Sequence, residues 1–341
     1  MDNEMIQRGF DLPPLEEERS LRPLQLADFN GQTEIKSKLE VYIQAAKKRE
    51  EALDHILFYG PPGLGKTTLA GIIAHEMNSE LRVTTGPALE KPGDLAAILS
   101  NLQDHDVLFI DEIHRMSTTI EEVLYSAMED FTLHIIVGKG PLARSICLNL
   151  PHFTLVGATT RLGLLSSPLR ARFGIVEQLR LYTQDELCTI LTRGADVMKM
   201  KVAPQACRSI ADRARGTPRI ALRLLRRVRD FAEVAGVPSV EQDLAVRAMD
   251  LLGLDSLGLD DGDRRILDAI VTLFGGGPVG LSTLAAALNE ESQTIEDIYE
   301  PYLIQKGMIE RTPRGRRATE NAYRYLGKTP PQAEADQIEF L

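Results

Sequence analysis

The segment GPPGLGKTT at residues 60–68 constrains this chain more than any other stretch of its sequence. Gly60, Gly65, Lys66 and Thr67 occupy the four fixed positions of the pattern G-x-x-x-x-G-K-[ST]. An apolar run precedes the segment and a helix-like run follows it, so the sequence predicts a strand, a turn and a helix in that order. Glycines let the backbone curl until successive N–H groups face a phosphate, and the helix N-terminus adds positive charge. We therefore expect a nucleotide site rather than a mere glycine- and proline-rich turn, with Lys66 on the β- and γ-phosphates and the Thr67 hydroxyl on Mg²⁺.

Strand candidates alternate with helical patterns up to residue 179. The strand-like runs lie at 55–59, 81–85, 107–111, 153–159 and 175–179. Strands that are apolar throughout and alternate with helices form parallel sheets covered on both faces. The sequence therefore predicts an α/β domain built on a parallel sheet.

Two acids stand at the end of the strand predicted at 107–111: Asp111 is its last residue and Glu112 follows it. Acids are costly to place there unless they face the carboxyl edge of the sheet, where open α/β sheets bind ligands. We expect Asp111 to hold Mg²⁺ through water and Glu112 to orient or deprotonate an attacking water; the alternative is a pair of acids in a solvated loop. His114 is given no catalytic role, because one histidine beside a site is more often structural.

Polar and basic residues follow the next buried strand. Thr159 and Thr160 end the run GATT, where a polar group can sense a γ-phosphate or position water. Arg170 and Arg172 lie shortly beyond it. Such an arginine can reach the nucleotide of a neighbouring subunit as an arginine finger, or it can form a surface ion pair.

A hairpin is predicted at 132–148, where two β-rich runs flank Gly138 and Pro141. Its tip and flanks carry more apolar residues than a lone hairpin can bury. The hairpin therefore either packs on its own domain or docks a partner protein.

Four helical patterns and no strands are predicted between Thr183 and Asp250, with Thr183 as an N-cap. Arg219 stands at the start of one of these helices, where the helix dipole disfavours a cation. That placement suggests an anionic ligand for Arg219, whereas the other arginines of the helix fit a solvated face.

The last part of the chain has the outline of a winged helix. After a linker at 253–263, helical patterns at 264–274, 282–288 and 294–306 precede a basic hairpin. This hairpin supplies the phosphate-binding candidates Arg311, Arg314, Arg316 and Arg317. Without a fold match, a basic surface loop is the alternative.

Charge and composition limit the possible partners. The net charge of −10 argues against nucleic-acid binding only if it is spread evenly, and it is not. The segment from Arg208 to Arg229 contains eight arginines and one acidic residue. The segment from Glu310 to Lys328 contains six basic and two acidic residues. Such local patches determine binding.

The sequence also indicates the surroundings in which the chain works. No apolar run approaches the ~18 residues of a membrane span, and the first twenty residues are too acidic for a signal peptide, so we expect a cytoplasmic protein without membrane contact. Cys147, Cys188 and Cys207 fit neither a disulfide framework nor a zinc site. We expect three buried or partly buried thiols.

Taken together, the motifs resemble the RuvB family of bacterial Holliday-junction branch-migration motors over about residues 20–328. The resemblance rests on the phosphate loop, DEIH, GATTR, SPLRARFG and GTPR in this order, followed by the winged-helix-like end. It implies an AAA+ ATPase with three domains and two tails. The alternatives are another AAA+ ATPase of DNA replication, of the clamp-loader or initiator type, and a DNA-binding regulator that uses ATP only as a switch. The expected boundaries are an acidic flexible tail at 1–20, an ATPase domain at 21–182, a helical lid at 183–252, a winged helix at 253–328 and a flexible tail at 329–341.

The resemblance also implies roles for single residues and for partners. Thr160 would be sensor 1, Arg172 the arginine finger and Arg219 sensor 2. The catalytic set is Lys66, Asp111, Glu112, Thr160 and Arg172; Thr67 and Asp111 would bind Mg²⁺, and Arg311 and Arg316 would bind DNA. The ATP-binding set is Leu21, Arg22, Gly63, Gly65, Lys66, Thr67, Thr68, Glu129, Asp130, Phe131, Arg172, Tyr182 and Arg219. The implied assembly is a homohexameric ring on duplex DNA at a Holliday junction, with a RuvA-like protein on the hairpin and a RuvC-like resolvase nearby.

Overall fold

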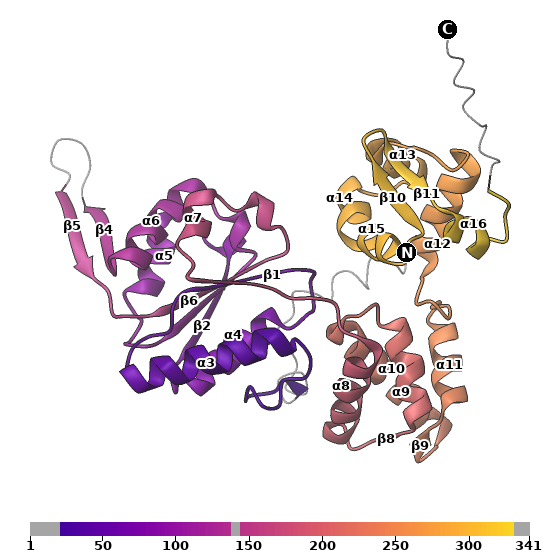
Figure 1. Ribbon diagram of the computed structural model, residues 1–341, viewed down its shortest axis with the longest axis horizontal. Coiled ribbons are helices and arrows are strands. Elements are labelled where there is room, and N and C mark those ends of the chain that lie inside the picture. The colour runs from indigo at the N-terminus through magenta and orange to yellow at the C-terminus, as the bar shows by residue number, and fades with distance from the viewer. Residues whose placement is uncertain (1–20, 138–143, 331–341) are drawn as a thin grey trace, which may run out of the picture.

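The computed structural model describes residues 21–137 and 144–330 (Figure 1). Its first part is a five-stranded sheet in the order β2-β3-β6-β1-β7, in which all neighbouring strands are parallel. The strands are β1 (Ile56–Tyr59), β2 (Leu81–Thr85), β3 (Val107–Asp111), β6 (Thr154–Thr159) and β7 (Ile175–Gln178). All five predicted strands are therefore confirmed, as is their parallel arrangement.

Helices cover both faces of this sheet. Successive residues of a strand point to opposite sides, and in the central strands the residues on both sides are apolar and must be buried. Ile56 and Phe58 pack in the core of one face, and Leu57 between them packs in the core of the other. Figure 1 shows α3 and α4 on one side and α5, α6 and α7 on the other. Their bounds are α3 (Thr33–Arg49), α4 (Lys66–Glu76), α5 (Pro92–Leu99), α6 (Thr118–Glu129) and α7 (Ser167–Ala171), with short 3₁₀ turns η2 (Gly86–Ala88), η3 (Ile113–Arg115) and η5 (Leu162–Leu164).

The expectation that the strands are covered on both faces is wrong at the edges of the sheet. Only β1, β3 and β6 are almost entirely buried, whereas Val83 on the edge strand β2 is 57% exposed. An edge strand has a neighbour on one side only, so its side chains are covered less completely. The prediction of burial throughout holds for the three strands that carry the site.

The predicted hairpin is present as β4 (Thr132–Val137) and β5 (Arg144–Asn149), which pair antiparallel. It extends from the end of the sheet domain that lies farthest from the lid (Figure 1). The predicted tip falls at 138–143, outside the described residues, as do the predicted tail at 1–20 and all but the first two residues of the tail predicted at 329–341. Cys147 on β5 is exposed, so the expectation of buried thiols is wrong for this residue; Cys188 is half-buried and Cys207 buried.

The four helices predicted after Thr183 are confirmed as α8 (Gln184–Val197), α9 (Pro204–Arg213), α10 (Pro218–Ala235) and α11 (Gln242–Leu251). Thr183 caps α8 as predicted, because its hydroxyl accepts from the Glu186 N–H at 3.3 Å. The expectation that strands are absent here is wrong. β8 (Lys201–Val202) pairs in parallel with β9 (Ser239–Val240), and strands of two residues are too short to leave a periodic pattern.

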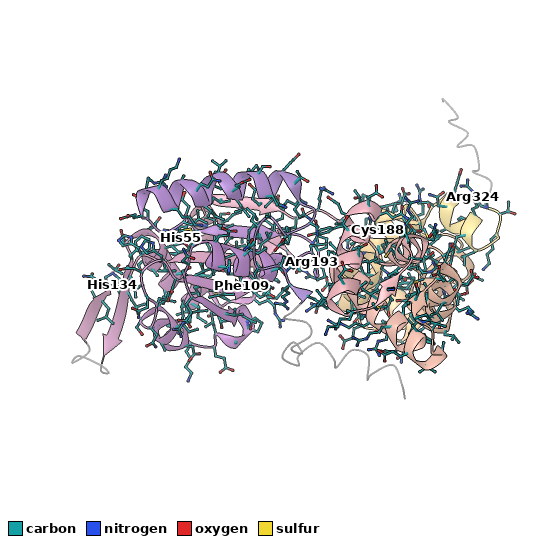
Figure 2. The ribbon with its side chains drawn as sticks, turned by 90° about the horizontal axis from the view of Figure 1, so that it is seen from below. His55, Phe109, His134, Cys188, Arg193 and Arg324 are labelled. Carbon is teal, nitrogen blue, oxygen red and sulfur yellow. The ribbon has the colours of Figure 1, made fainter. Side chains whose placement is uncertain are left out.

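The lid and the sheet domain share one hydrophobic cluster, which runs from the α3 and α4 face of the sheet into the lid helices. Polar contacts join the same two parts. Arg193 on α8 donates to the Asp28 carbonyl at 3.2 Å, and Gln32 holds the segment that leads to the lid by donating to the Arg180 carbonyl at 2.6 Å. Figure 2 shows Arg193 between the lid and the sheet domain. The boundary between these parts is therefore a packed interface.

The last part has a hydrophobic core of its own. Its elements are α12 (Asp261–Asp268), the π-helical turn η6 (Ala269–Leu273), α13 (Leu281–Leu288), α14 (Ser292–Thr294), the π-helical turn η7 (Ile295–Tyr299), α15 (Glu300–Gln305), β10 (Ile309–Thr312), β11 (Gly315–Ala318) and α16 (Glu320–Tyr325). The predicted helices and basic hairpin are confirmed, and α16 was missed. Only Ala322 and Tyr323 of α16 are buried, which is too few to give a helical period.

A buried ion pair fixes this winged helix to the lid. Arg215, between α9 and α10, donates to Asp263 at 2.5 Å, to Asp260 at 3.0 Å and to the Gly258 carbonyl at 3.0 Å. The Asp263 side chain is fully buried, and the guanidinium lies 4.9 Å from the centre of the Tyr302 ring. Within the described ranges, no helix is both long and apolar enough to cross a bilayer.

Candidate nucleotide-binding site

The loop between β1 and α4 has the backbone shape that its glycines predict. Gly60, Gly63 and Gly65 all have positive φ angles, of 139°, 77° and 101°. A Cβ on Gly63 would lie 2.7 Å from the Thr217 methyl carbon and 3.0 Å from the Arg219 Cβ. Only glycine therefore allows this loop to lie so close to the start of α10.

Lys66 is held inside this loop. The residue is 7% exposed, and its Nζ donates to the carbonyls of Gly60 and Pro61, each at 2.9 Å. Burial lowers the pKa of Lys66, whereas nearby Asp111 and Glu112 raise it. A buried ammonium group with two backbone carbonyls as partners suits a bound anion, because an ion pair would offset its desolvation better.

The predicted acids lie at the carboxyl end of β3, as the sequence predicts. Asp111 is the last residue of the strand, and its Oδ1 accepts from the Glu112 N–H at 3.0 Å. Burial and the neighbouring Asp111 raise the pKa of Glu112, while Lys66 and a hydrogen bond from Thr160 lower it. The Glu112 side chain is 34% exposed, so it keeps access to water while its basicity is increased.

His114 lies closer to these groups than its sequence position suggests. Its Nδ1 is 2.8 Å from the Thr159 hydroxyl, and its Nε2 is 3.4 Å from Glu112 Oε2. The sequence carries no signal for the first contact, because Thr159 lies 45 residues away. The sequence reasoning named His114 as structural but did not anticipate these two contacts.

The lid completes the surroundings of the loop. The Tyr182 hydroxyl donates to the Leu64 carbonyl at 3.0 Å, and the Arg219 N–H donates to the Gly63 carbonyl at 3.4 Å. Arg219 is also close enough to lower the pKa of Lys66. Thr67 and Thr68 form the first turn of α4, while Leu21 is buried against the lid and Arg22, next to it, is half-buried. The sheet domain and the lid together surround the loop.

A second group of predicted residues lies elsewhere, around the end of α6. Arg172 donates to Glu129 at 3.0 Å and to the Pro168 carbonyl at 2.9 Å, and its guanidinium lies 4.3 Å from the centre of the Tyr125 ring. The Phe131 ring, two residues after Glu129, packs 4.3 Å from that of His152, centre to centre. Asp130 ends α6 between them. Because α6 and α7 cover the face opposite α4 (Figure 1), the structure does not bring this group to the loop of its own chain.

The predicted metal ligands fit magnesium only together with a ligand that brings oxygens of its own. Thr67 and Asp111 supply a hydroxyl and a carboxylate at the phosphate loop. Among the residues that the structure describes, no group of three or more His, Cys, Asp and Glu side chains could hold a metal. This donor set is typical of Mg²⁺ sites in which phosphates complete the coordination.

The predicted DNA-binding arginines flank a buried carboxylate. Arg316 donates to Glu300 at 3.0 Å and Arg311 contacts the same carboxylate, whose side chain is 1% exposed. Arg311 remains 51% exposed, whereas Arg316 is only 15% exposed. The arginine-rich stretch before residue 230 presents less charge than its sequence suggests, because Arg213 is buried and Arg215 forms the ion pair with Asp263.

Comparisons with known proteins agree with this arrangement over nearly the whole chain. Residues 21–179 match the family profile of the Holliday junction DNA helicase RuvB P-loop domain. Residues 182–255 match the RuvB AAA lid domain, and residues 256–327 match the RuvB C-terminal winged helix domain.

Solved structures point to the same family. The RuvB Holliday junction branch migration motor of Thermotoga maritima is 50% identical in sequence, with a TM-score of 0.83; the match covers 92% of this chain and 100% of that one. A variant of the same protein gives a TM-score of 0.84 at 50% identity, covering 91% of this chain and 100% of that one. At this identity and coverage, the chain belongs to the RuvB family.

Proposed function

We propose that this chain is an ATP-driven motor that moves duplex DNA and drives branch migration at Holliday junctions in homologous recombination and repair. One observation carries the proposal. Lys66 is buried in a positive-φ glycine loop beside Asp111 and Glu112, and the lid residue Arg219 contacts the same loop. A triphosphate bound there would touch both the sheet domain and the lid, so its cleavage would alter the contact between them.

The residues in and around the loop have separate roles in ATP hydrolysis. Lys66 neutralises phosphate charge, and Glu112, with its raised pKa, holds the attacking water and accepts its proton. Thr160 contacts the Glu112 carboxylate, where a polar group can sense the γ-phosphate. Mg²⁺, held by Thr67 and Asp111, would supply further neutralisation of the phosphate oxygens when bound.

Arg172 serves the nucleotide of a neighbouring copy in this proposal. Its position on the α6 and α7 face, away from the loop of its own chain, supports that role. Glu129 holds the guanidinium at 3.0 Å until a phosphate takes its place. A site that needs a residue from the next subunit requires a head-to-tail assembly of identical copies, which is complete at every site when it closes into a ring; we propose a homohexamer.

The winged helix carries the DNA contacts. Arg311 and Arg316 would bind backbone phosphates in competition with Glu300, and the lid would carry the domain with it through Arg215. The hairpin at 132–148 would dock a RuvA-like protein, with a RuvC-like resolvase nearby. A motor of this kind works where the chromosome lies, and we place it in the cytoplasm.

Mixing two inactive variants tests the ring and the finger. Lys66→Ala should lose nucleotide binding, and Arg172→Ala should lose hydrolysis, whereas Arg170→Ala, an exposed neighbour on α7, should hydrolyse ATP normally. An equal mixture of the first two should regain up to about a quarter of the wild-type rate, since half of the sites keep Lys66 and half of those face an intact Arg172. If no mixture recovers activity, Arg172 does not act across subunits.

The motor itself is tested with a labelled four-way junction, ATP and a RuvA-like junction-binding protein. We expect strand exchange with the wild-type chain and none with Lys66→Ala. Hydrolysis without strand exchange would leave the ATPase standing and refute the branch-migration function.

A further inference from the structure

His114 occupies a buried position between the carboxylate at the end of β3 and the end of β6. It lies in η3, and its side chain is only 6% exposed. One ring nitrogen faces the Thr159 hydroxyl at 2.8 Å and the other faces Glu112 Oε2 at 3.4 Å. The Thr159 residue is itself fully buried. The ring thus links the end of β3 to the end of β6, and this contact forms only once the two strands have paired.

The partners of the imidazole determine which nitrogen carries its proton. A carboxylate only accepts hydrogen bonds, so the Nε2 that faces Glu112 must be the protonated one. Burial and the positive charges of Arg115 and Arg161 lower the pKa of His114, so the ring is neutral and its Nδ1 is an acceptor. The Thr159 hydroxyl then donates to Nδ1 and accepts from the Arg161 N–H at 3.0 Å. In this assignment every hydrogen-bond donor in the series faces an acceptor.

Glu112 itself has an unusual backbone conformation. Its φ angle of 49° is left-handed, a conformation that residues with a Cβ seldom adopt. The Glu112 carboxylate lies close enough to Asp111 and Lys66 for both charges to act on it. A carboxylate that is one-third exposed has several rotamers open to it; Thr160 donates a hydrogen bond to it, and the buried His114 offers a second donor.

We propose that His114 is a positioning residue for ATP hydrolysis: its Nε2–H fixes the Glu112 carboxylate toward the attacking water, and the Thr159 hydroxyl fixes the ring. This inference rests on the proposed function, since it assigns Glu112 to the water. The 3.4 Å between Nε2 and Oε2 is long for a hydrogen bond, and this proposal requires it to shorten in the reacting complex. In this role His114 acts on the reaction only through Glu112.

Matched substitutions separate this role from simple packing. His114→Gln keeps a donor near the Nε2 position, whereas His114→Asn is too short to reach Glu112. Thr159→Ser keeps the hydroxyl and Thr159→Val removes it. We expect His114→Asn and Thr159→Val to lower kcat about 10- to 100-fold, as expected for a misplaced catalytic group, with KM and nucleotide affinity within about threefold of wild type. His114→Gln and Thr159→Ser should restore most of the rate.

A double-mutant cycle with Glu112→Gln gives the decisive readout. If His114 works through Glu112, His114→Asn should slow wild-type protein but leave the residual rate of Glu112→Gln unchanged. An equal fold-loss in both backgrounds, or a matching loss of nucleotide affinity, would reduce His114 to a packing residue and overturn the proposal. Thr159→Val repeats the cycle should His114→Asn fail to fold. Near-normal hydrolysis by Glu112→Gln would instead overturn the function assigned to Glu112 itself.

Discussion

Replacing Arg215 by methionine should destabilise the junction between lid and winged helix, and the loss should grow with pH. Asp263 is fully buried there and accepts from Arg215 and from the Asp260 N–H at 2.9 Å. Burial raises the pKa of Asp263 to about 7, and Arg215 opposes that rise. Because the folded-state pKa exceeds the unfolded value of about 3.9, the stability gained from protonated Asp263 is complete below about pH 4 and is lost as the pH rises to 7.

The two proteins should diverge above that pH. Wild-type protein then holds ionised Asp263 beside Arg215, so its stability stops falling. Without Arg215 the pKa of Asp263 rises further, and the variant continues to lose about 1.4 kcal/mol per pH unit. At pH 6 the variant should lack only the hydrogen bonds and ring contact of Arg215, about 1–3 kcal/mol. By pH 8.5 the difference should widen by about 2 kcal/mol, toward the range of a broken buried ion pair.

Hydrogen exchange of the α12 amides measures this difference where it arises. The free energy of opening would be determined by mass spectrometry between pH 6 and 8.5, after correction for intrinsic exchange rates. Asp263→Asn removes the titrating group, so adding Arg215→Met to that background should give a difference that does not depend on pH. A difference that is also constant in the native background would refute the coupling between Arg215 and Asp263.

Two further predictions concern the ligand sites. Gly63→Ala should weaken ATP binding at least about tenfold, because the added methyl meets Thr217 and Arg219 at 3.0 Å or less on a left-handed backbone that also disfavours alanine; Gly93→Ala, with nothing within 4 Å of its Cβ position, should bind normally in a fluorescent-nucleotide titration. Arg311→Gln should lower the slope of log affinity for duplex DNA against log salt by about 1, while exposed Arg247 on the lid should tolerate the same change; an unchanged slope would show that Arg311 contacts no phosphate.

Features that depend on neighbouring residues could be predicted from the sequence. The strand, turn and helix around Gly60 and Lys66, and the strand that ends at Asp111, follow from local patterns. Glycine spacing, apolar runs and helix starts each involve only a few neighbouring residues. Thr183 is a similar case, since its cap needs only Glu186, three residues away. Such signals sufficed for the parallel sheet, the four lid helices and the basic hairpin.

Contacts between distant residues could not be predicted in this way. His114 gains its importance from Thr159 and Arg215 from Asp263, across 45 and 48 residues, and no local pattern joins these pairs. The exposure of single side chains could not be predicted either. Cys147, for example, is exposed on a strand whose composition suggests burial. Each of these facts depends on how whole elements pack.

The apolar cluster that runs unbroken from the sheet domain into the lid limits how the lid can move. Helices that share a core slide past one another by small amounts, because a wide opening would expose that core to water. Each cycle of ATP can therefore turn this joint only slightly. The winged helix is attached at the far end of the lid, so any rotation of the lid moves its basic hairpin through a longer arc than it moves the residues beside the Lys66 loop.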